Sequence, residues 1–251
     1  MKNSRSVFVF LLCVVNWVSC NFGAEVQQIG LSNTSTVETS SRIIGGTETT
    51  IETYPFAVQI NRGNSLVCGG SLLTRQIVLS AAHCFFDEDG VLIDIFHFRV
   101  RAGTTNNNSG GTVVRISRLI IHEKYNIPLR DNDIALLQMR FPLTLSDSIG
   151  LVEIPKQNFV LDDNTELKQI GWGSTMEDEL RMSPVLMEVT VRKINHELCR
   201  QRYQLLANGT SLFLVTDSML CAGLLGVGGK HFPRRRRGLS TFTKIGSISF
   251  L

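Results

Sequence analysis

Two short segments of this sequence carry side chains that can move a proton. The first is Ser80-Ala81-Ala82-His83-Cys84. An imidazole ionises near neutral pH, so His83 can take a proton from a hydroxyl group and return it to a leaving group. The second segment, Asp131-Asn132-Asp133, supplies two carboxylates just before an apolar run. From the residues alone, either aspartate also fits a turn before a buried strand.

The other histidines have no comparable setting. A lone histidine is more often a surface residue or a satisfied core residue than a catalytic base, and we interpret four in this way: His97, His122, His196 and His231.

The segments that must position His83 and the two aspartates are predicted to be β-strands. Short runs rich in β-branched and aromatic residues alternate with turn residues from about residue 56 onward. Many short strands with frequent turns predict an all-β sandwich or barrel. A short helix is predicted over 197–206. The predicted strands are 56–60, 76–80, 98–102, 112–116, 134–138, 168–172 and 186–191.

The N-terminal region has the pattern of a secretory signal followed by a pro-segment. Lys2 and Arg5 precede the apolar run 7–15, and Cys20 is small enough to end a cleavage site. A membrane anchor is the alternative, but spanning a bilayer needs about 20 apolar residues. We therefore expect a signal peptide over 1–20 and a secreted, extracellular protein. Residues 21–42 are polar without an apolar period, which predicts a flexible pro-segment.

Cysteines and glycosylation sequons fit that route. Cys13 and Cys20 would leave with the signal peptide, and an even number of cysteines suits an oxidising compartment. Those that remain are Cys68, Cys84, Cys199 and Cys221. Candidate glycosylation sites lie at Asn33, Asn107 and Asn208.

Several motifs in a fixed order make residues 43–230 resemble a secreted trypsin-like (chymotrypsin-type) serine protease domain. No single motif would suffice, but their order is specific. The resemblance implies a fold of two antiparallel six-stranded Greek-key barrels. Besides the two segments above, the motifs are Arg42-Ile43-Ile44-Gly45-Gly46, Tyr54-Pro55-Phe56, Cys68-Gly69-Gly70-Ser71-Leu72, Gly171-Trp172-Gly173, and Cys221-Ala222-Gly223 with Gly228-Gly229-Lys230.

The resemblance implies roles for individual residues. It makes His83 the general base, and the family pattern Asn-Asp-Ile-Ala-Leu selects Asp133 over Asp131 as the acid that orients the imidazole. It also implies that an activating protease cuts after Arg42. The freed ammonium of Ile43 would then need a buried acidic partner, because a desolvated charge is costly alone.

The resemblance further implies two disulfides, Cys68–Cys84 and Cys199–Cys221. The first would close a loop of 84 − 68 = 16 residues, which stabilises a fold by about 3 kcal/mol in the loop-entropy model. It would also fix the segment that presents His83.

The resemblance stops after Lys230. The family typically continues Asp-Ser-Cys-Gln-Gly-Asp-Ser-Gly-Gly-Pro, whereas this chain continues His231-Phe232-Pro233-Arg234. Four family features are therefore missing: the pocket-floor aspartate, the nucleophilic serine, the glycine of the oxyanion hole and the aspartate that receives Ile43. We expect no nucleophile, an incomplete second barrel and an unrelated basic tail over 231–251.

Ser240 is a poor substitute for the missing serine. It lies ten residues after Lys230 rather than the seven of the family, and Thr241 and Phe242 stand where a tight turn needs glycines. The run Arg234–Arg237 fits a processing site or a heparin-like or nucleic-acid patch, but we favour a solvated charge run.

The composition and net charge limit which partners and functions we expect. The 251 residues are 43% hydrophobic and 19% charged, enough for one or two domains, and the net charge of +3 is too small to argue for nucleic acid. We expect a monomer with no cofactor, no metal and no membrane partner, acting on proteins or peptides if active. By family the chain is a serine endopeptidase zymogen, expected here to be inactive. The alternatives are a non-catalytic secreted binding protein on a protease scaffold, or a mis-assembled gene product.

Overall fold

The computed structural model describes residues 46–126, 131–173, 182–207 and 215–223. Several sequence predictions fall outside these residues: the signal peptide, the pro-segment, Arg42 and Ile43, the sequons at Asn33 and Asn208, Ser240, and the basic tail.

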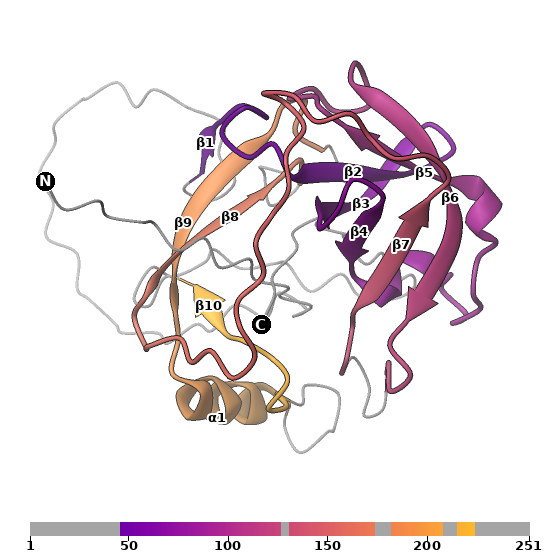
Figure 1. Ribbon diagram of the computed structural model, residues 1–251. Coiled ribbons are helices and arrows are strands. Elements are labelled where there is room, and N and C mark those ends of the chain that lie inside the picture. The colour runs from indigo at the N-terminus through magenta and orange to yellow at the C-terminus, as the bar shows by residue number, and fades with distance from the viewer. Residues whose placement is uncertain (1–45, 127–130, 174–181, 208–214, 224–251) are drawn as a thin grey trace, which may run out of the picture.

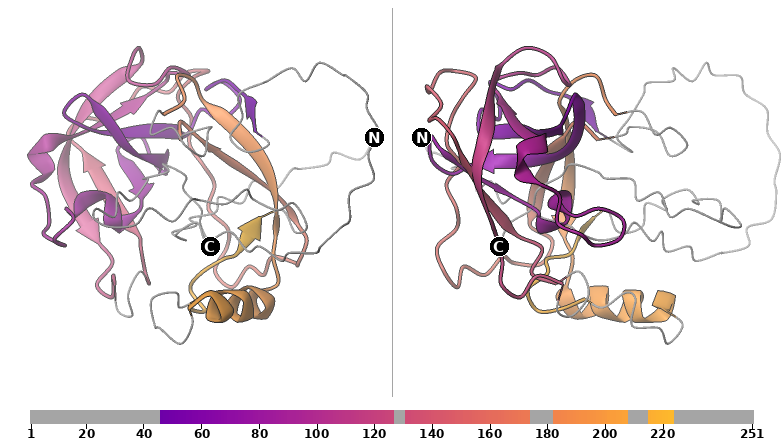
Figure 2. Two further views of the ribbon diagram at one scale, coloured as in Figure 1. Left: turned by 180° about the vertical axis from the view of Figure 1, so that it is seen from behind. Right: turned by 90° about the vertical axis from the view of Figure 1, so that its right-hand side faces the viewer.

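Six antiparallel strands close into a barrel in the first half of the chain (Figures 1 and 2). Around the barrel their order is β2-β3-β4-β7-β6-β5. Residues in β5 and β7 alternate between buried and half-buried positions, as expected when one strand face lines a core. The strands are β2 (Ala57–Arg62), β3 (Ser65–Leu72), β4 (Ile77–Ser80), β5 (Phe98–Ala102), β6 (Thr112–Ile121) and β7 (Ala135–Met139).

Strand β3 was not among the predicted strands, because its paired glycines lower β-propensity. Packing explains why one glycine is needed. A Cβ on Gly70 would lie 2.6 Å from Cγ1 of Val78 and 3.0 Å from Cγ2 of Val58. Neighbouring strands therefore approach β3 as closely as only a glycine allows.

Within the described residues the second sheet is open and has four strands, three from the second half of the chain and β1 from its beginning. Strand β9 (Met187–Lys193) pairs with β1 (Thr47–Glu48), β8 (Glu166–Gly171) and β10 (Ala222–Gly223). Helix α1 (His196–Ala207) follows β9, which confirms the predicted helix. The prediction of an all-β, two-barrel architecture with an incomplete second barrel is also confirmed.

An apolar cluster and a set of hydrogen bonds join the barrel to the open sheet. Trp172, only 2% exposed, donates from Nε1 to the carbonyl oxygen of Thr105 at 2.7 Å. The same oxygen accepts from the backbone of Leu186 at 2.9 Å, and Asn107 N donates to Pro184 O at 2.8 Å. We call these contacts the interbarrel clasp. The cluster beside it comprises Ile51, Tyr54, Phe56, Ala57, Leu66, Leu79, Trp172 and Leu186.

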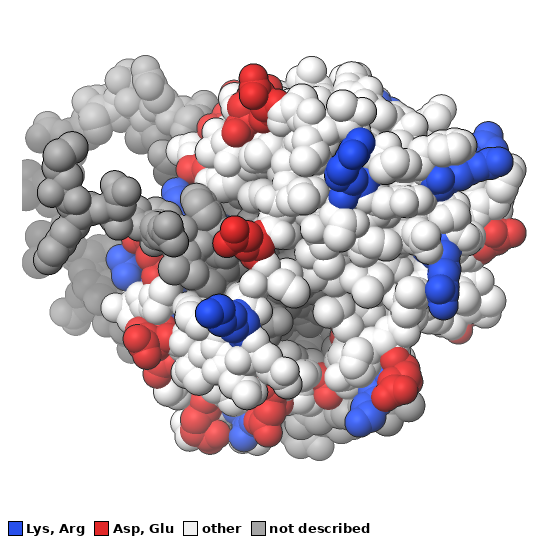
Figure 3. Space-filling model, in the orientation of Figure 1, with Lys and Arg blue, Asp and Glu red and all other residues white. Residues whose placement is uncertain are grey.

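The surface in Figure 3 carries acidic and basic side chains interspersed. Among the described residues, no helix combines the length and apolarity needed to cross a bilayer.

Candidate active site

Strand pairing brings His83 and Asp133 together across 50 residues of sequence. Strands β4 and β7 are antiparallel neighbours, and Ser80 at the end of β4 lies opposite Ala135 at the start of β7. His83 lies just after Ser80 at the end of β4, and Asp133 lies just before Ala135 at the start of β7. Both side chains therefore emerge at the same end of the strand pair.

A short 3-10 helix, η1 (Ala82–Phe85), holds the backbone of His83. Ala82 and Phe85 in this turn are completely buried, and the ring of Phe85 packs edge-on against Phe98 at 5.0 Å between centroids. The turn is thus anchored in the barrel core on either side of His83. This anchoring limits how far the imidazole can move.

Asp133 holds His83 through two hydrogen bonds. Nδ1 of the imidazole lies 2.7 Å from Oδ2, and the backbone N–H of His83 donates to Oδ1, also at 2.7 Å. The side chain of Asp133 is 5% exposed, against 32% for His83. With Nδ1–H assigned as the donor to Asp133, Nε2 keeps its lone pair and can accept a proton. The pair therefore has the form of an oriented general base.

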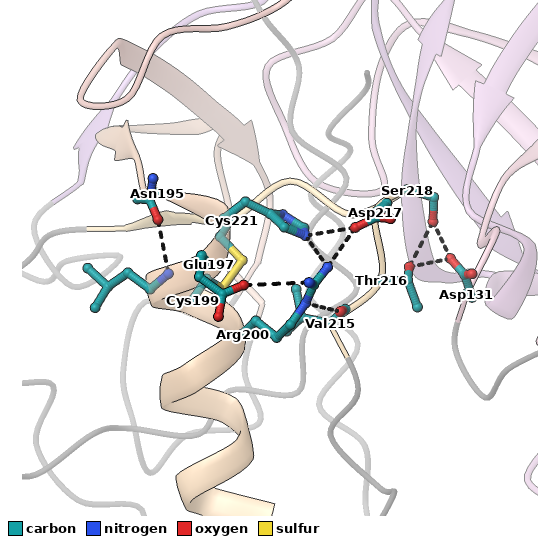
Figure 4. Close-up of polar contacts among 12 residues, drawn as sticks. Asp131, Asn195, Glu197, Cys199, Arg200, Val215, Thr216, Asp217, Ser218 and Cys221 are labelled. Carbon is teal, nitrogen blue, oxygen red and sulfur yellow. Dashed lines mark hydrogen bonds and ion pairs between the residues drawn. A yellow bond between two sulfur atoms is a disulfide. The ribbon is translucent and has the colours of Figure 1, made fainter.

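Asp131 makes contacts that are separate from those of Asp133. One of its oxygens, Oδ1, accepts hydrogen bonds from the hydroxyl groups of Thr216, at 2.8 Å, and Ser218 (Figure 4). The same oxygen also accepts from the backbone N–H of Asn132 at 2.8 Å. Asn132 between the two aspartates has a left-handed φ of 52°, which asparagine tolerates well. Burial raises the pKa of Asp131, but these hydrogen bonds outweigh burial and hold it below the usual range.

Sequence reasoning missed the contacts of Thr216 and Ser218 with Asp131. They lie 85 and 87 residues from Asp131, and nothing in their local sequence signals a partner in the other half of the molecule. The two carboxylates thus divide their roles: Asp133 orients His83, and Asp131 joins the loop before β10 to the barrel.

Both disulfides implied by the resemblance are present, between Cys68 and Cys84 and between Cys199 and Cys221. The first links β3 to η1 directly beside His83. Its sulfur atoms lie 3.9 Å (Cys68) and 3.7 Å (Cys84) from Nε2 of the imidazole. Nε2 therefore faces the disulfide.

The second disulfide belongs to a group of contacts that secures the loop holding Asp131 (Figure 4). Arg200 of α1 donates to the carboxylate of Asp217 at 2.6 Å and to the carbonyl oxygen of Val215 at 3.3 Å. The Cys199–Cys221 bond joins the same helix to the residue before β10. Helix α1 thus holds both ends of the loop that carries Thr216 and Ser218.

The remaining described histidines and the described sequon make local contacts. His122 Nδ1 accepts from the backbone of Lys124 at 3.2 Å, and His196 contacts Arg200 one helical turn away, at 3.0 Å. His97 packs against the ring of Phe96. The side-chain amide of Asn107 donates to Ser183 O at 3.0 Å, so a glycan on that nitrogen would have to share the space of this contact.

Comparison with known proteins decides the family. The family model described as Trypsin matches residues 43–232. The chain belongs to the trypsin family. Trypsin CFT-1 of Choristoneura fumiferana is 37% identical to it over 198 residues, which cover 77% of this chain and 73% of that protein. Achelase-1 of Lonomia achelous is 36% identical over 75% of this chain and 85% of its own length.

A solved structure extends the likeness to three dimensions. The crystal structure of scabies mite inactivated protease paralogue S-D1 matches this trypsin-family chain with a TM-score of 0.64 and 26% identity. The match covers 72% of this chain and 73% of the other.

Proposed function

We propose that this trypsin-family protein keeps the base and acid of a serine endopeptidase but does not hydrolyse peptide bonds. The observation that carries the proposal is the sequence after Lys230. His231-Phe232-Pro233 begins a segment, 231–251, without the Gly-Asp-Ser-Gly-Gly run that supplies the nucleophile in this family. The base is oriented by Asp133 and has no family serine to activate.

The expected loss of rate is large. A serine protease that loses one triad member keeps a residual acceleration of about 10³–10⁴ over water, which depends on the oxyanion hole and substrate binding. Here the glycine whose N–H helps form that hole is missing together with the serine. Among the described residues, the recorded partners of His83 Nε2 are the two disulfide sulfurs, neither of which can be deprotonated. We therefore expect no measurable turnover.

The related scabies mite structure supports the proposal, because it has a similar fold and belongs to an inactivated protease. That protein is described as an inactivated protease paralogue. By analogy, a trypsin-like fold can persist in a chain that no longer cleaves substrates.

We further propose that the chain enters the secretory route through its signal peptide, 1–20, and that cleavage after Arg42 removes the pro-segment, 21–42. Strand β1 begins at Thr47 and pairs with β9, so the segment freed by cleavage leads directly into the second sheet. The family aspartate that would receive the Ile43 ammonium is missing from this sequence. Cleavage would therefore not organise an active site, because a buried ammonium needs a charged partner.

The test treats the secreted full-length chain with trypsin and confirms Ile43 as the new N-terminus by mass spectrometry. The product is then incubated with Arg and Lys ester substrates and with a fluorophosphonate probe, beside an active trypsin as a positive control. We expect neither turnover nor labelling. Stoichiometric labelling would overturn the proposal.

A second candidate function is non-catalytic binding of a protein partner. The complete barrel, the interbarrel clasp and the two disulfides favour it, because they give the chain a stable scaffold without the missing segment. This function requires an efficiently secreted product with a cooperative thermal unfolding transition. Aggregation or intracellular retention would instead favour a mis-assembled gene product.

A further inference from the structure

Three potential metal ligands converge beside the base. The Sγ atoms of Cys68 and Cys84 and the Nε2 atom of His83 all lie within 4.8 Å of one another. Within the described part of the chain, no other group of three or more His, Cys, Asp or Glu residues converges in this way. The two sulfurs are joined in a disulfide, so the cluster cannot bind a metal in its oxidised form.

We propose that reduction of the Cys68–Cys84 disulfide creates a zinc site made of the two thiolates and Nε2 of His83. A zinc ion bound there would occupy Nε2 of His83, the nitrogen through which the imidazole can accept a proton. The site would couple the redox state of the disulfide to the availability of His83.

The distances fit a zinc ion with little movement. Zn–S bonds of about 2.3 Å and a Zn–N bond of about 2.0 Å at tetrahedral angles place sulfur and nitrogen about 3.5 Å apart. The observed distances from Nε2 are 3.9 Å to Cys68 Sγ and 3.7 Å to Cys84 Sγ. Only the two sulfurs must move apart, to about 3.8 Å for two thiolates on one zinc ion.

The surroundings of the cluster also suit a metal. Asp133 binds Nδ1 of His83 at 2.7 Å, the carboxylate–histidine arrangement that fixes the ring and strengthens Nε2 as a ligand. Cys68 and Cys84 are 3% and 2% exposed, whereas the His83 side chain is 32% exposed. A zinc ion would thus be enclosed on the sulfur side and open to water on the histidine side, which leaves its fourth position for solvent.

The chemistry balances with a thiol reductant. Two electrons from two reductant thiols break the S–S bond, giving Cys68 and Cys84 as free thiols and the reductant as its disulfide. On binding, each cysteine thiol releases its proton to solvent, and Zn²⁺ takes two thiolates and the neutral imidazole. Reoxidation of the cysteines would expel the metal.

The experiment reduces the full-length chain with a trialkylphosphine under anaerobic conditions and measures zinc affinity by competition with a chromophoric chelator. Cobalt(II) substitution reports thiolate ligation through its near-ultraviolet charge-transfer bands, and far-ultraviolet circular dichroism reports the fold. We expect one tight site in the reduced chain and at least a 100-fold weaker affinity in the oxidised chain.

Matched variants separate this site from non-specific chelation. Cys68→Ser and His83→Ala should each weaken zinc binding at least tenfold. Asp133→Asn keeps all three ligands and should weaken it 10- to 100-fold through the lost support of His83. The double variant C199S/C221S should retain the affinity within about threefold, because those cysteines lie outside the cluster.

Three results would overturn the proposal. The first is equal affinity in the reduced parent and the Cys68→Ser variant, which would indicate chelation by an unfolded chain. The second is a cobalt complex without thiolate bands. The third is loss of the β-sheet signal on reduction that zinc does not restore. These outcomes are independent of peptidase activity, so they do not bear on the proposed function.

Discussion

Asp131 offers a sharp test of how the two halves of the molecule are joined. Asp131 is 8% exposed, and its carboxylate accepts hydrogen bonds from the hydroxyl groups of Thr216 and Ser218 in the loop before β10. Replacing it in an Asp131→Asn variant keeps the shape and one acceptor oxygen but removes the charge. The variant should leave the His83–Asp133 pair intact and loosen the loop.

The expected loss of stability follows from the weakening of the hydrogen bonds that Asp131 accepts. A hydrogen bond to a charged group contributes about 1.5–3 kcal/mol, against about 0.5–1.5 kcal/mol for a neutral pair. Asp131 Oδ1 accepts three such bonds, but the hydroxyl groups of Thr216 and Ser218 also lie within 3.0 Å of each other and can partly satisfy one another. We expect Asp131→Asn to lower the free energy of unfolding by about 2 kcal/mol at pH 7.

The difference in the free energy of unfolding between the parent chain and the Asp131→Asn variant should depend on pH in a defined direction. The folded state holds the pKa of Asp131 below its usual range, so the stabilisation is fully present above the unfolded value of about 3.9. It should disappear as the pH falls through the lower folded pKa, because protonated Asp131 also lacks the charge. Urea unfolding of both chains at pH 7 and at about pH 3 measures this difference.

The control is Asp147→Asn, which makes the same charge change at an exposed position. It should alter the free energy of unfolding by less than about 0.5 kcal/mol. The reasoning fails if Asp131→Asn is as stable as the parent at pH 7, or if its deficit is the same at both pH values.

Three further substitutions test the packing around the site. Gly70→Ala should cost about 1–3 kcal/mol in urea unfolding by crowding strand β4, and a neutral result would contradict the close approach seen there. Trp172→Phe should cost about 2 kcal/mol, because the donor to Thr105 O and part of the buried ring are lost; an unchanged melting curve would argue against the clasp. Burial and the neighbouring Glu188 carboxylate raise the pKa of Tyr54 above its usual range. Near pH 10 the parent and Tyr54→Phe chains should therefore give the same tyrosinate absorbance, and they should differ only at higher pH. A difference in absorbance already at pH 10 would refute the buried contact of Tyr54 with Glu188.

Local sequence predicted most strands but not the contacts between them. The strands at 98–102 and 134–138 were recognised because β-formers recur there and turn residues flank them. Strand β3 was missed because its two glycines have low β-propensity, and the reason for one of them, contact with Val58 and Val78, exists only after the strands pair.

The choice between Asp131 and Asp133 illustrates the same limit. Both aspartates lie before the same strand, and their residue types are identical. The pairing of Ser80 with Ala135 places Asp133 beside His83, and the left-handed Asn132 lets Asp131 turn toward the other half. Family resemblance could select Asp133, but only the strand register gives the physical reason.

The closed barrel also has a consequence for the order of folding during synthesis. Its strands run from Ala57 to Met139, so every strand that positions His83 and Asp133 leaves the ribosome before any strand of the second sheet after β1. The hydrogen-bonded pair of His83 and Asp133 can assemble while the second half is still being translated. Leu143 and Ile149 complete the core of this unit, so sequence changes beyond Ile149 leave its strands and its core in place. A lineage could therefore lose the distal segment without losing a well-formed histidine and aspartate.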